Sequence, residues 1–250
     1  MAQKLEGCRP QQRCGSGACD VCLRIYRLKH IGEGTRLLGN CAEVRTVSAT
    51  PHWGTAEVGE LSTVDLGSRL EPYVRGLKRT VPSGTLIIGG ADVSLNTFEN
   101  ADPHWCVHPY FVIGATDRAI DWDAVRSYCR RHAPTADSGR VFRPVRISRA
   151  PVPSGELSVV LGYALKSVFS WRSAYTDVRK KTGRPFRNSR DLPIPSNRGV
   201  ELWLFLDRYR IADRVMLAGV RRHGDGANFV LHRQQVSGVT LNAPKFRRSR

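Results

Sequence analysis

One apolar run near the middle of the chain begins with several polar side chains, in the sequence Pro-His-Trp-Cys-Val-His-Pro-Tyr-Phe-Val-Ile from Pro103 to Ile113. Runs of this kind are typical of β-strands, in which alternate side chains lie on the same face. One face is predicted to pack in a core through Trp105, Val107 and Phe111. The opposite face would carry His104, Cys106, His108 and Tyr110. This strand therefore predicts a site for a metal ion or a phosphate.

The length and composition are those of a folded globular chain. The 250 residues are 41% hydrophobic and 24% charged, which is ordinary for such proteins. No run of about 18 apolar residues is present, so we expect no helix that crosses a bilayer and no membrane partner. The N-terminus lacks the apolar core of a secretory signal. These features predict a cytoplasmic protein.

Basic residues are concentrated in the second part of the chain. Residues 1–139 carry 16 Lys and Arg against 15 Asp and Glu, whereas residues 140–250 carry 23 against 7. An excess of this size predicts a polyanionic partner, most often nucleic acid. A basic surface without a specific partner is the alternative.

Aromatic residues lie among the basic ones in this part, namely Trp171, Tyr175 and Phe186. Bases of single-stranded DNA stack on aromatic side chains while cations meet the phosphates. Alternatively, the aromatic residues pack in the core and the arginines are solvated. The candidate DNA-binding residues are Arg143, Arg146, Arg149, Arg179, Lys180, Lys181, Arg184 and Arg187.

Four of the seven cysteines lie close together near the N-terminus, with the spacing C-x5-C-x4-C-x2-C. An odd number of cysteines without a secretion signal argues against a disulfide framework. The last two have the spacing of a zinc knuckle. We predict a structural Zn²⁺ site, with Cys41 or His30 as substitute ligands, and with scattered thiols or a redox pair as the alternatives. The predicted ligands are Cys8, Cys14, Cys19 and Cys22.

Periodicity and turn residues predict a mixture of strands and helices. We expect strands over 85–95 and 141–149, and a loop over 182–199. We expect helices over 70–78, from an N-cap at Asp121 to Arg131, from Ser154 to about 170, and over 200–217. Because helices and strands do not alternate regularly, the pattern favours an α+β fold over a doubly wound one. The expected organisation is a cysteine module over 1–45, a main domain over 46–240 and a basic tail over 241–250.

The helix expected after Ser154 contains a tyrosine and a lysine three positions apart, Tyr163 and Lys166. Residues at this spacing lie on nearly the same side of a helix. An ammonium group near a phenol stabilises negative charge on the phenolate or on a phosphate that it attacks. The alternative is a half-buried tyrosine beside a solvated lysine.

Taken in order, these motifs resemble the rolling-circle replication initiators of plasmids and phages, within the HUH endonuclease superfamily. The similarity spans nearly the whole chain. The segment from Arg13 to Cys22 is similar to the cysteine segment that precedes the nuclease core, and Ala91–Leu95 to the strand before the histidine strand. Residues 111–125 are similar to the strand, turn and helix that follow. Gly162–Ser167 is similar to the motif that carries the nucleophile.

The resemblance implies an antiparallel sheet flanked by helices, and an enzyme that nicks single-stranded origin DNA. Tyr163 would attack a phosphodiester, forming a 5′-phosphotyrosine and releasing a 3′-hydroxyl that primes synthesis. Lys166 would contact the phosphate or a metal-bound water. His108 would bind Mg²⁺ or Mn²⁺, which polarises the scissile phosphate. No helicase P-loop is present, so unwinding would need a host helicase, and synthesis a host polymerase.

The chain departs from the family pattern at the second histidine, which is replaced by Tyr110. A tyrosine is a poor ligand for Mg²⁺ unless it is ionised, and Pro109 predicts an edge strand or a bulge. His104 or Cys106 would complete the site, or a carboxylate would do so, with Asp92 preferred over Glu99 because it lies on the preceding strand. Otherwise the metal site is degraded, and the chain is a non-catalytic DNA-binding protein or regulator. An RNA-binding module has no motif in its favour.

Overall fold

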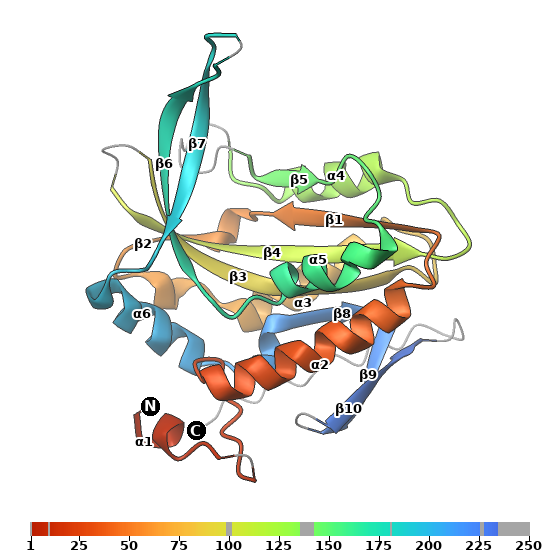
Figure 1. Cartoon of the computed structure of the whole chain (residues 1–250), viewed down its shortest axis with the longest axis horizontal. Coiled ribbons are helices and arrows are strands. Elements are labelled where there is room, and N and C mark those ends of the chain that lie inside the picture. Colours follow the sequence, from red (N-terminus) through yellow and green to blue (C-terminus); the bar gives the residue numbers. More distant parts are fainter. Residues whose placement is uncertain are drawn as a thin grey trace.

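A mostly antiparallel sheet forms the centre of the molecule (Figure 1). The computed structural model describes residues 2–9, 11–98, 102–135, 143–180, 182–225 and 228–234. Within them, eight strands form one sheet with the main order β5-β1-β4-β3-β6-β7, while β2 pairs with β4 and β8 with β3. The β3–β6 pair is parallel and the other pairs of this sheet are antiparallel. The predicted α+β class is confirmed.

The strands of this sheet are β1 (Glu43–Ala49), β2 (Thr55–Glu57), β3 (Leu86–Phe98), β4 (His104–Ala115), β5 (Val145–Ile147), β6 (Ser170–Val178), β7 (Pro185–Leu192) and β8 (Val215–Ala218). A separate hairpin contains β9 (Val220–Asp225) and β10 (Asn228–Arg233). The helices are α1 (Ala2–Glu6), α2 (Asp20–Leu38), α3 (Leu66–Lys78), α4 (Trp122–Arg131), α5 (Leu157–Ala164) and α6 (Ser196–Asp207). None of the described helices is long and apolar enough to span a membrane.

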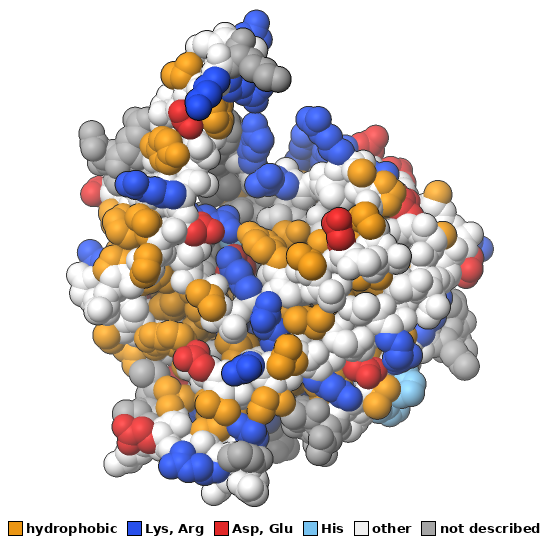
Figure 2. Space-filling view, in the orientation of Figure 1, with side chains coloured by type: hydrophobic (Ala, Val, Ile, Leu, Met, Phe, Trp, Pro, Cys, Tyr) orange, Lys and Arg blue, Asp and Glu red, His pale blue; other side chains and the backbone are white. Residues whose placement is uncertain are grey.

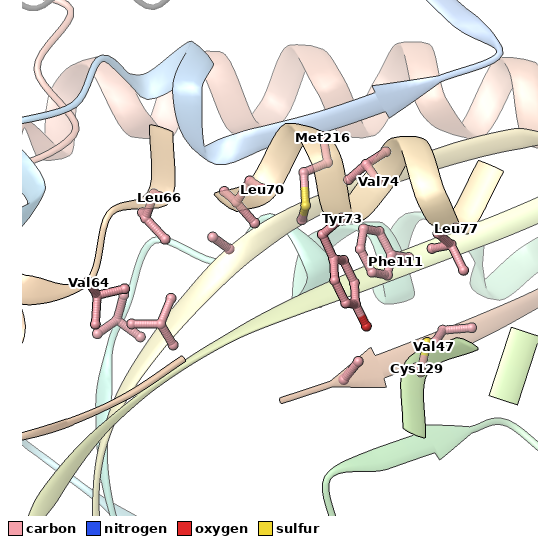
Figure 3. Close-up of a cluster of buried hydrophobic side chains, with 14 of the residues drawn as sticks. Val47, Val64, Leu66, Leu70, Tyr73, Val74, Leu77, Phe111, Cys129 and Met216 are labelled. Carbon is pink, nitrogen blue, oxygen red and sulfur yellow. The ribbon is translucent and has the colours of Figure 1, made fainter. Parts of the chain in front are cut away.

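Alternation along β4 divides its side chains between the two faces of the sheet as predicted. Trp105, Val107 and Phe111 join a core that also contains buried residues of α3, α4 and α6. In Figure 3 the side chains of α3 pack over β4, where Tyr73 stacks on Phe111 with 6.3 Å between ring centroids. Removing this apolar surface from water, at about 25 cal/mol per Å², is the main force that holds α3 on the sheet.

Helices α2 and α5 cover part of the opposite face and lie in front of the sheet in Figure 1. Leu23 of α2 and Leu161 of α5 share a second core with Val112 of β4.

The expected domain boundaries compare with the fold as follows: residue 45, the expected end of the cysteine module, lies within β1. The expected basic tail over 241–250 lies outside the described residues.

Several expected elements are confirmed with small changes in their ends. The Asp121 carboxylate accepts from the backbone amides of Asp123 and Ala124, which makes it the N-cap of α4. The expected helix over 70–78 begins earlier, at Leu66, because the side chain of Asp65 caps it. The third expected strand is reduced to β5, and part of its range, 141–142, lies outside the described residues.

The expected helix from Ser154 to about residue 170 is wrong in its second half. Helix α5 ends at Ala164, and the chain then pairs with β3 as the parallel strand β6. The loop expected over 182–199 is also wrong, because Pro185–Leu192 forms β7 and pairs with β6. Non-local pairing overrides the local helix and turn preferences here. Together β6 and β7 form a hairpin that projects from the sheet (Figure 1).

The expected helix over 200–217 is replaced by α6 and then β8, which pairs with β3 from Gly90 to Ile87.

The position of Pro109 also differs from expectation, because β4 lies inside the sheet and not at its edge. On one side of β4, the neighbouring strand changes from β1, which pairs up to Tyr110, to β2, which starts opposite Cys106. Proline lies between these two pairings, where its missing amide proton removes no bond of either ladder.

The end of α5 packs closely against the sheet at Gly90 of β3. A Cβ atom on Gly90 would lie 2.4 Å from the carbonyl oxygen of Ala164. Because of this close approach, the residues that follow Ala164 reach the next position on the same face of β3, which is Asp92.

We predict that Gly90→Ala destabilises the fold by about 1–3 kcal/mol, the usual cost of overpacking a close contact. Gly155→Ala is the matched control, because a Cβ atom at Gly155 has nothing within 4 Å. Urea unfolding of both variants measures the difference. An unchanged stability for Gly90→Ala would contradict the close seating of α5.

Candidate nucleic-acid cleft and cysteine cluster

A cleft of about 650 Å³ opens on the same face of the sheet as α2 and α5, over the part that these two helices leave uncovered. Its floor contains side chains of β1, β3 and β4, including Thr46, Ser94 and His108. The β6–β7 hairpin forms one wall, and the segment around β5 contributes to the lining as well. Figure 2 shows Lys and Arg side chains on both sides of the notch beside this hairpin. The arginines that line the cleft are Arg143, Arg146, Arg172 and Arg187.

A buried carboxylate lies beneath the floor and is held by two basic groups. Asp92 Oδ2 is 2.6 Å from Lys166 Nζ and 3.1 Å from His108 Nε2. These contacts join three elements, since Asp92 and His108 are opposite each other in the β3–β4 ladder and Lys166 follows α5. Asp92 was predicted as a ligand of the divalent ion beside His108. It does lie next to His108, but its contacts are with His108 and Lys166.

The three groups stabilise one another as ions. Burial raises the pKa of Asp92, but His108 and Lys166 lower it more, so that the net pKa is about 2. Burial lowers the pKa of His108, but the Asp92 carboxylate raises it more, to about 10. The arrangement is therefore an anion between two cations at neutral pH.

Tyr163 lies in the last turn of α5 and lines the cleft. Its side chain is 43% exposed, and its hydroxyl oxygen accepts a hydrogen bond from Arg172 Nη2 at 2.8 Å. Lys166 Nζ is 5.3 Å from the centre of the Tyr163 ring. The predicted pair is thus brought together, although Lys166 lies beyond the helix and its closest ionic contact is Asp92.

Tyr110 lies beside Tyr163, with 4.8 Å between ring centroids in an edge-to-face arrangement. Burial raises the pKa of Tyr110, so that its phenol is neutral at physiological pH. A neutral phenol is a weak ligand for Mg²⁺ or Mn²⁺.

The structure does not bring His104 to His108. They are four positions apart along β4, which corresponds to about 14 Å at a rise of ~3.4 Å per residue. His104 is opposite Asn96 in the ladder, and it does not line the cleft. It therefore lies too far away to bind the same ion as His108.

A divalent ion does not fit the donors in this cleft. Within the described part of the chain, the only group of three or more His, Cys, Asp and Glu side chains that could hold a metal is the set of four cysteines. The described residues that line the cleft include four arginines and no carboxylate, and Glu99 lies outside the described residues. Asp92, beneath them, is already contacted by Lys166 and His108. We therefore derive no chemical step through Mg²⁺ or Mn²⁺.

The other predicted DNA-binding residues occupy different places. Arg179, Lys180 and Arg184 lie at the turn of the hairpin, and Lys181 is outside the described residues. Arg149 is exposed beyond β5 and does not line the cleft. Arg187 lies in β7, with its guanidinium 4.0 Å from the centre of the Phe98 ring.

Sequence reasoning missed Arg172, which contacts the candidate nucleophile directly. The expected helix ran to about residue 170 and left Arg172 without a role. The alternation of Trp171, Arg172, Ser173 and Ala174 is the signal that a strand starts here. Pairing with β7 brings Arg172 opposite Asp191, and its Nε is 3.4 Å from Asp191 Oδ1.

The four N-terminal cysteines converge in space. One ligand atom from each of the four lies within 4.8 Å of the others. Cys22 Sγ is 3.4 Å from Cys8 Sγ and 3.8 Å from Cys14 Sγ. A tetrahedral ion with metal–sulfur bonds of about 2.3 Å requires sulfur–sulfur distances of about 3.8 Å. The cluster can therefore hold a metal ion.

Local structure explains how the cysteine loop closes. Gly15 adopts a φ of +65°, which favours glycine. The Gly17 amide donates to the Tyr209 carbonyl at 2.8 Å, and a Cβ atom at Gly17 would lie 2.7 Å from the Leu206 carbonyl oxygen. Cys19 and Cys22 lie at the start of α2, where the helix dipole favours thiolates. The loop is thus anchored to the end of α6.

The two substitute ligands lie elsewhere. His30 Nδ1 is 2.9 Å from the Tyr26 carbonyl oxygen and packs against Phe229. The thiol of Cys41 is 3.9 Å from Arg233 Nη2. Neither belongs to the group of four cysteines.

Comparison with family models, curated proteins and solved structures finds no match to this chain. The function is therefore inferred from the geometry of the cleft and of the cysteine cluster.

We predict that His108 causes the stability of the protein to fall as the pH rises into the alkaline range. Its folded-state pKa is raised from 6.5 to about 10, so its contribution is complete below pH 6.5 and is lost as the pH rises toward 10. The groups that cause the shift are Asp92 and Cys106. Urea unfolding between pH 6 and pH 10 should show a smaller loss of stability for His108→Gln than for the wild type. His223→Gln, at an exposed position of β9, should follow the wild type, and identical curves for all three proteins would contradict the ion pair.

We predict that the purified protein contains a metal ion bound to the cysteine cluster. Cys22→Ser should lose this ion and unfold at a lower temperature, because the ligands converge only in the folded chain. Cys41→Ser should retain it. Elemental analysis by mass spectrometry and thermal unfolding measure both effects, and equal metal content in the two variants would contradict the assignment.

Proposed function

We propose that this protein cleaves single-stranded DNA by attack of the Tyr163 hydroxyl on a phosphodiester, and that it acts as a rolling-circle replication initiator. The observation that carries the proposal is the partly exposed Tyr163 in the lining of an arginine-rich cleft, with its hydroxyl oxygen in a hydrogen bond from Arg172. A phenol is a suitable nucleophile when cations stabilise the oxygen and the phosphate.

Charge in the cleft favours a polyanionic strand over a small neutral ligand. Among the described residues, four arginines and no carboxylate belong to its lining, so this lining attracts phosphate groups. Thr46, Ser48 and Thr50 of the floor supply hydroxyl groups that donate to phosphate oxygens. The cleft therefore suits a sugar–phosphate backbone.

An exposed aromatic side chain of the hairpin, Tyr175, supports a single strand over a duplex. Trp171 does not contribute, because its ring packs against the hydrophobic core and does not line the cleft. Tyr175, which is partly exposed, accepts a hydrogen bond from Asn188. Unpaired bases stack on surfaces of this kind.

The reaction transfers the phosphoryl group from the 3′ oxygen of the DNA to the Tyr163 oxygen. The Tyr163 oxygen forms a bond to phosphorus, the bond from phosphorus to the 3′ oxygen breaks, and the phenol proton passes to water. The 3′ oxygen takes up a proton and leaves as a hydroxyl group. The protein retains the downstream DNA as a 5′-phosphotyrosine.

For the cysteine cluster we propose Zn²⁺ in a structural role. Four thiolates in tetrahedral reach are the ligand set of structural zinc sites, which leave no position open for catalysis. The N-terminal segment has few core residues of its own, so the ion would fix the loop before α2.

We predict a covalent adduct between the protein and single-stranded DNA. A random-sequence pool labelled at its 3′ end should yield a slow band on a denaturing gel, because Tyr163 retains the downstream fragment. Reactions are run with Mg²⁺, with Mn²⁺ and without added metal. Peptide mass spectrometry should place the DNA on Tyr163.

Tyr163→Phe should abolish the adduct, whereas Tyr128→Phe, on the other face of the sheet, should retain it. Tight binding of the pool without an adduct under every metal condition would refute the nuclease. It would instead support the second candidate, a non-catalytic DNA-binding protein, which is favoured by the missing second histidine at Tyr110.

A further inference from the structure

Arg172 contacts Tyr163 directly and is held in position by a second contact, with Asp191. It donates from Nη2 to the Tyr163 hydroxyl oxygen at 2.8 Å, and its Nε is 3.4 Å from Asp191 Oδ1. The side chain thus spans from β7 to the end of α5. Only 28% of it is exposed, so solvent screens its charge less than that of a free arginine.

The groups around Tyr163 already supply the positive charge that a metal ion would bring. Lys166 lies 5.3 Å from the ring, and His108 shares Asp92 with it. With His108 protonated, these three residues carry a net positive charge beneath the floor. Arg146 and Arg187 add further charge from the lining.

The donors needed for a divalent ion are absent from the described lining, which contains no carboxylate. A cation brought into this lining would be repelled by four guanidinium groups. A phosphate would be attracted by the same groups. The site is therefore complementary to the substrate alone, without an ion between them.

We infer that Arg172 is a catalytic residue that replaces the divalent metal ion, so that cleavage by Tyr163 is independent of added metal. This inference rests on the proposed function. Arg172 stabilises the tyrosine oxygen as it loses its proton, and it then meets the non-bridging oxygens of the phosphate as negative charge grows on them. A guanidinium suits this role because its several donors lie in one plane and it keeps its charge.

The experiment compares single-turnover adduct formation at saturating DNA, with and without Mg²⁺ or Mn²⁺, in metal-depleted buffer. Elemental analysis confirms that the cysteine-bound ion is retained throughout. Single-turnover rates at saturation separate chemistry from binding. The variants are Arg172→Gln and Arg172→Lys, with Arg75→Gln as the control on α3.

We expect the wild-type rate to be unchanged within about twofold when metal is removed. Arg172→Gln should lose roughly 100-fold or more, the usual effect of removing one preorganised donor to a developing charge. Arg172→Lys should recover part of this loss, because it restores the charge without the planar donors. Thermal unfolding and circular dichroism identify any variant that fails to fold. If Arg172→Gln does not fold, the rate of Arg172→Lys relative to the wild type tests the inference.

Two results would overturn the inference while leaving the proposed function intact. One is an adduct that forms only when Mg²⁺ or Mn²⁺ is added. The other is a rate for folded Arg172→Gln and Arg172→Lys equal to that of Arg75→Gln. An absence of adduct from the wild type in every condition would instead refute the proposed function, and this inference with it.

Discussion

The ion pairs of Asp92 connect the sheet to the helix that carries the candidate nucleophile. A carboxylate that is nearly fully buried is costly unless it is paired, and removing one partner of such a group typically costs about 3–5 kcal/mol. His108 fixes it across the β3–β4 ladder, and Lys166 fixes it to the end of α5. The close approach of Ala164 to Gly90 makes the second contact possible. The position of Tyr163 depends on this arrangement.

The hairpin of β6 and β7 forms one wall of the cleft on the sheet. It begins at Ser170, shortly after α5 ends at Ala164, so one short segment carries both the tyrosine and the arginine that donates to it. Parallel pairing with β3 holds Arg172 at a fixed distance from the floor. Chemistry in the cleft is thereby determined by two adjacent elements, while the cysteine cluster stabilises a separate part of the chain.

Much of the site was predictable because strand alternation is a local property. The faces of β4, the Asp121 cap and the convergence of the four cysteines follow from periodicity, capping and spacing. The hairpin was not predictable, because residues 182–199 are rich in glycine, proline and arginine, which indicate a loop. Strand β6 is stabilised by pairing with β3, a segment far away in the sequence, and β7 is stabilised by pairing with β6. Arg172 was missed for the same reason.

By itself the sequence determined the residue types and their order: a cysteine set, a strand with alternating polar side chains, and a tyrosine followed by a lysine. Only the tertiary structure decided which of them meet. It separated His104 from His108, because residues four apart on one strand cannot share an ion. It placed Lys166 on Asp92, and it brought Arg172 to Tyr163. Distances between elements depend on packing and on pairing across the sheet, and neither is encoded in local periodicity.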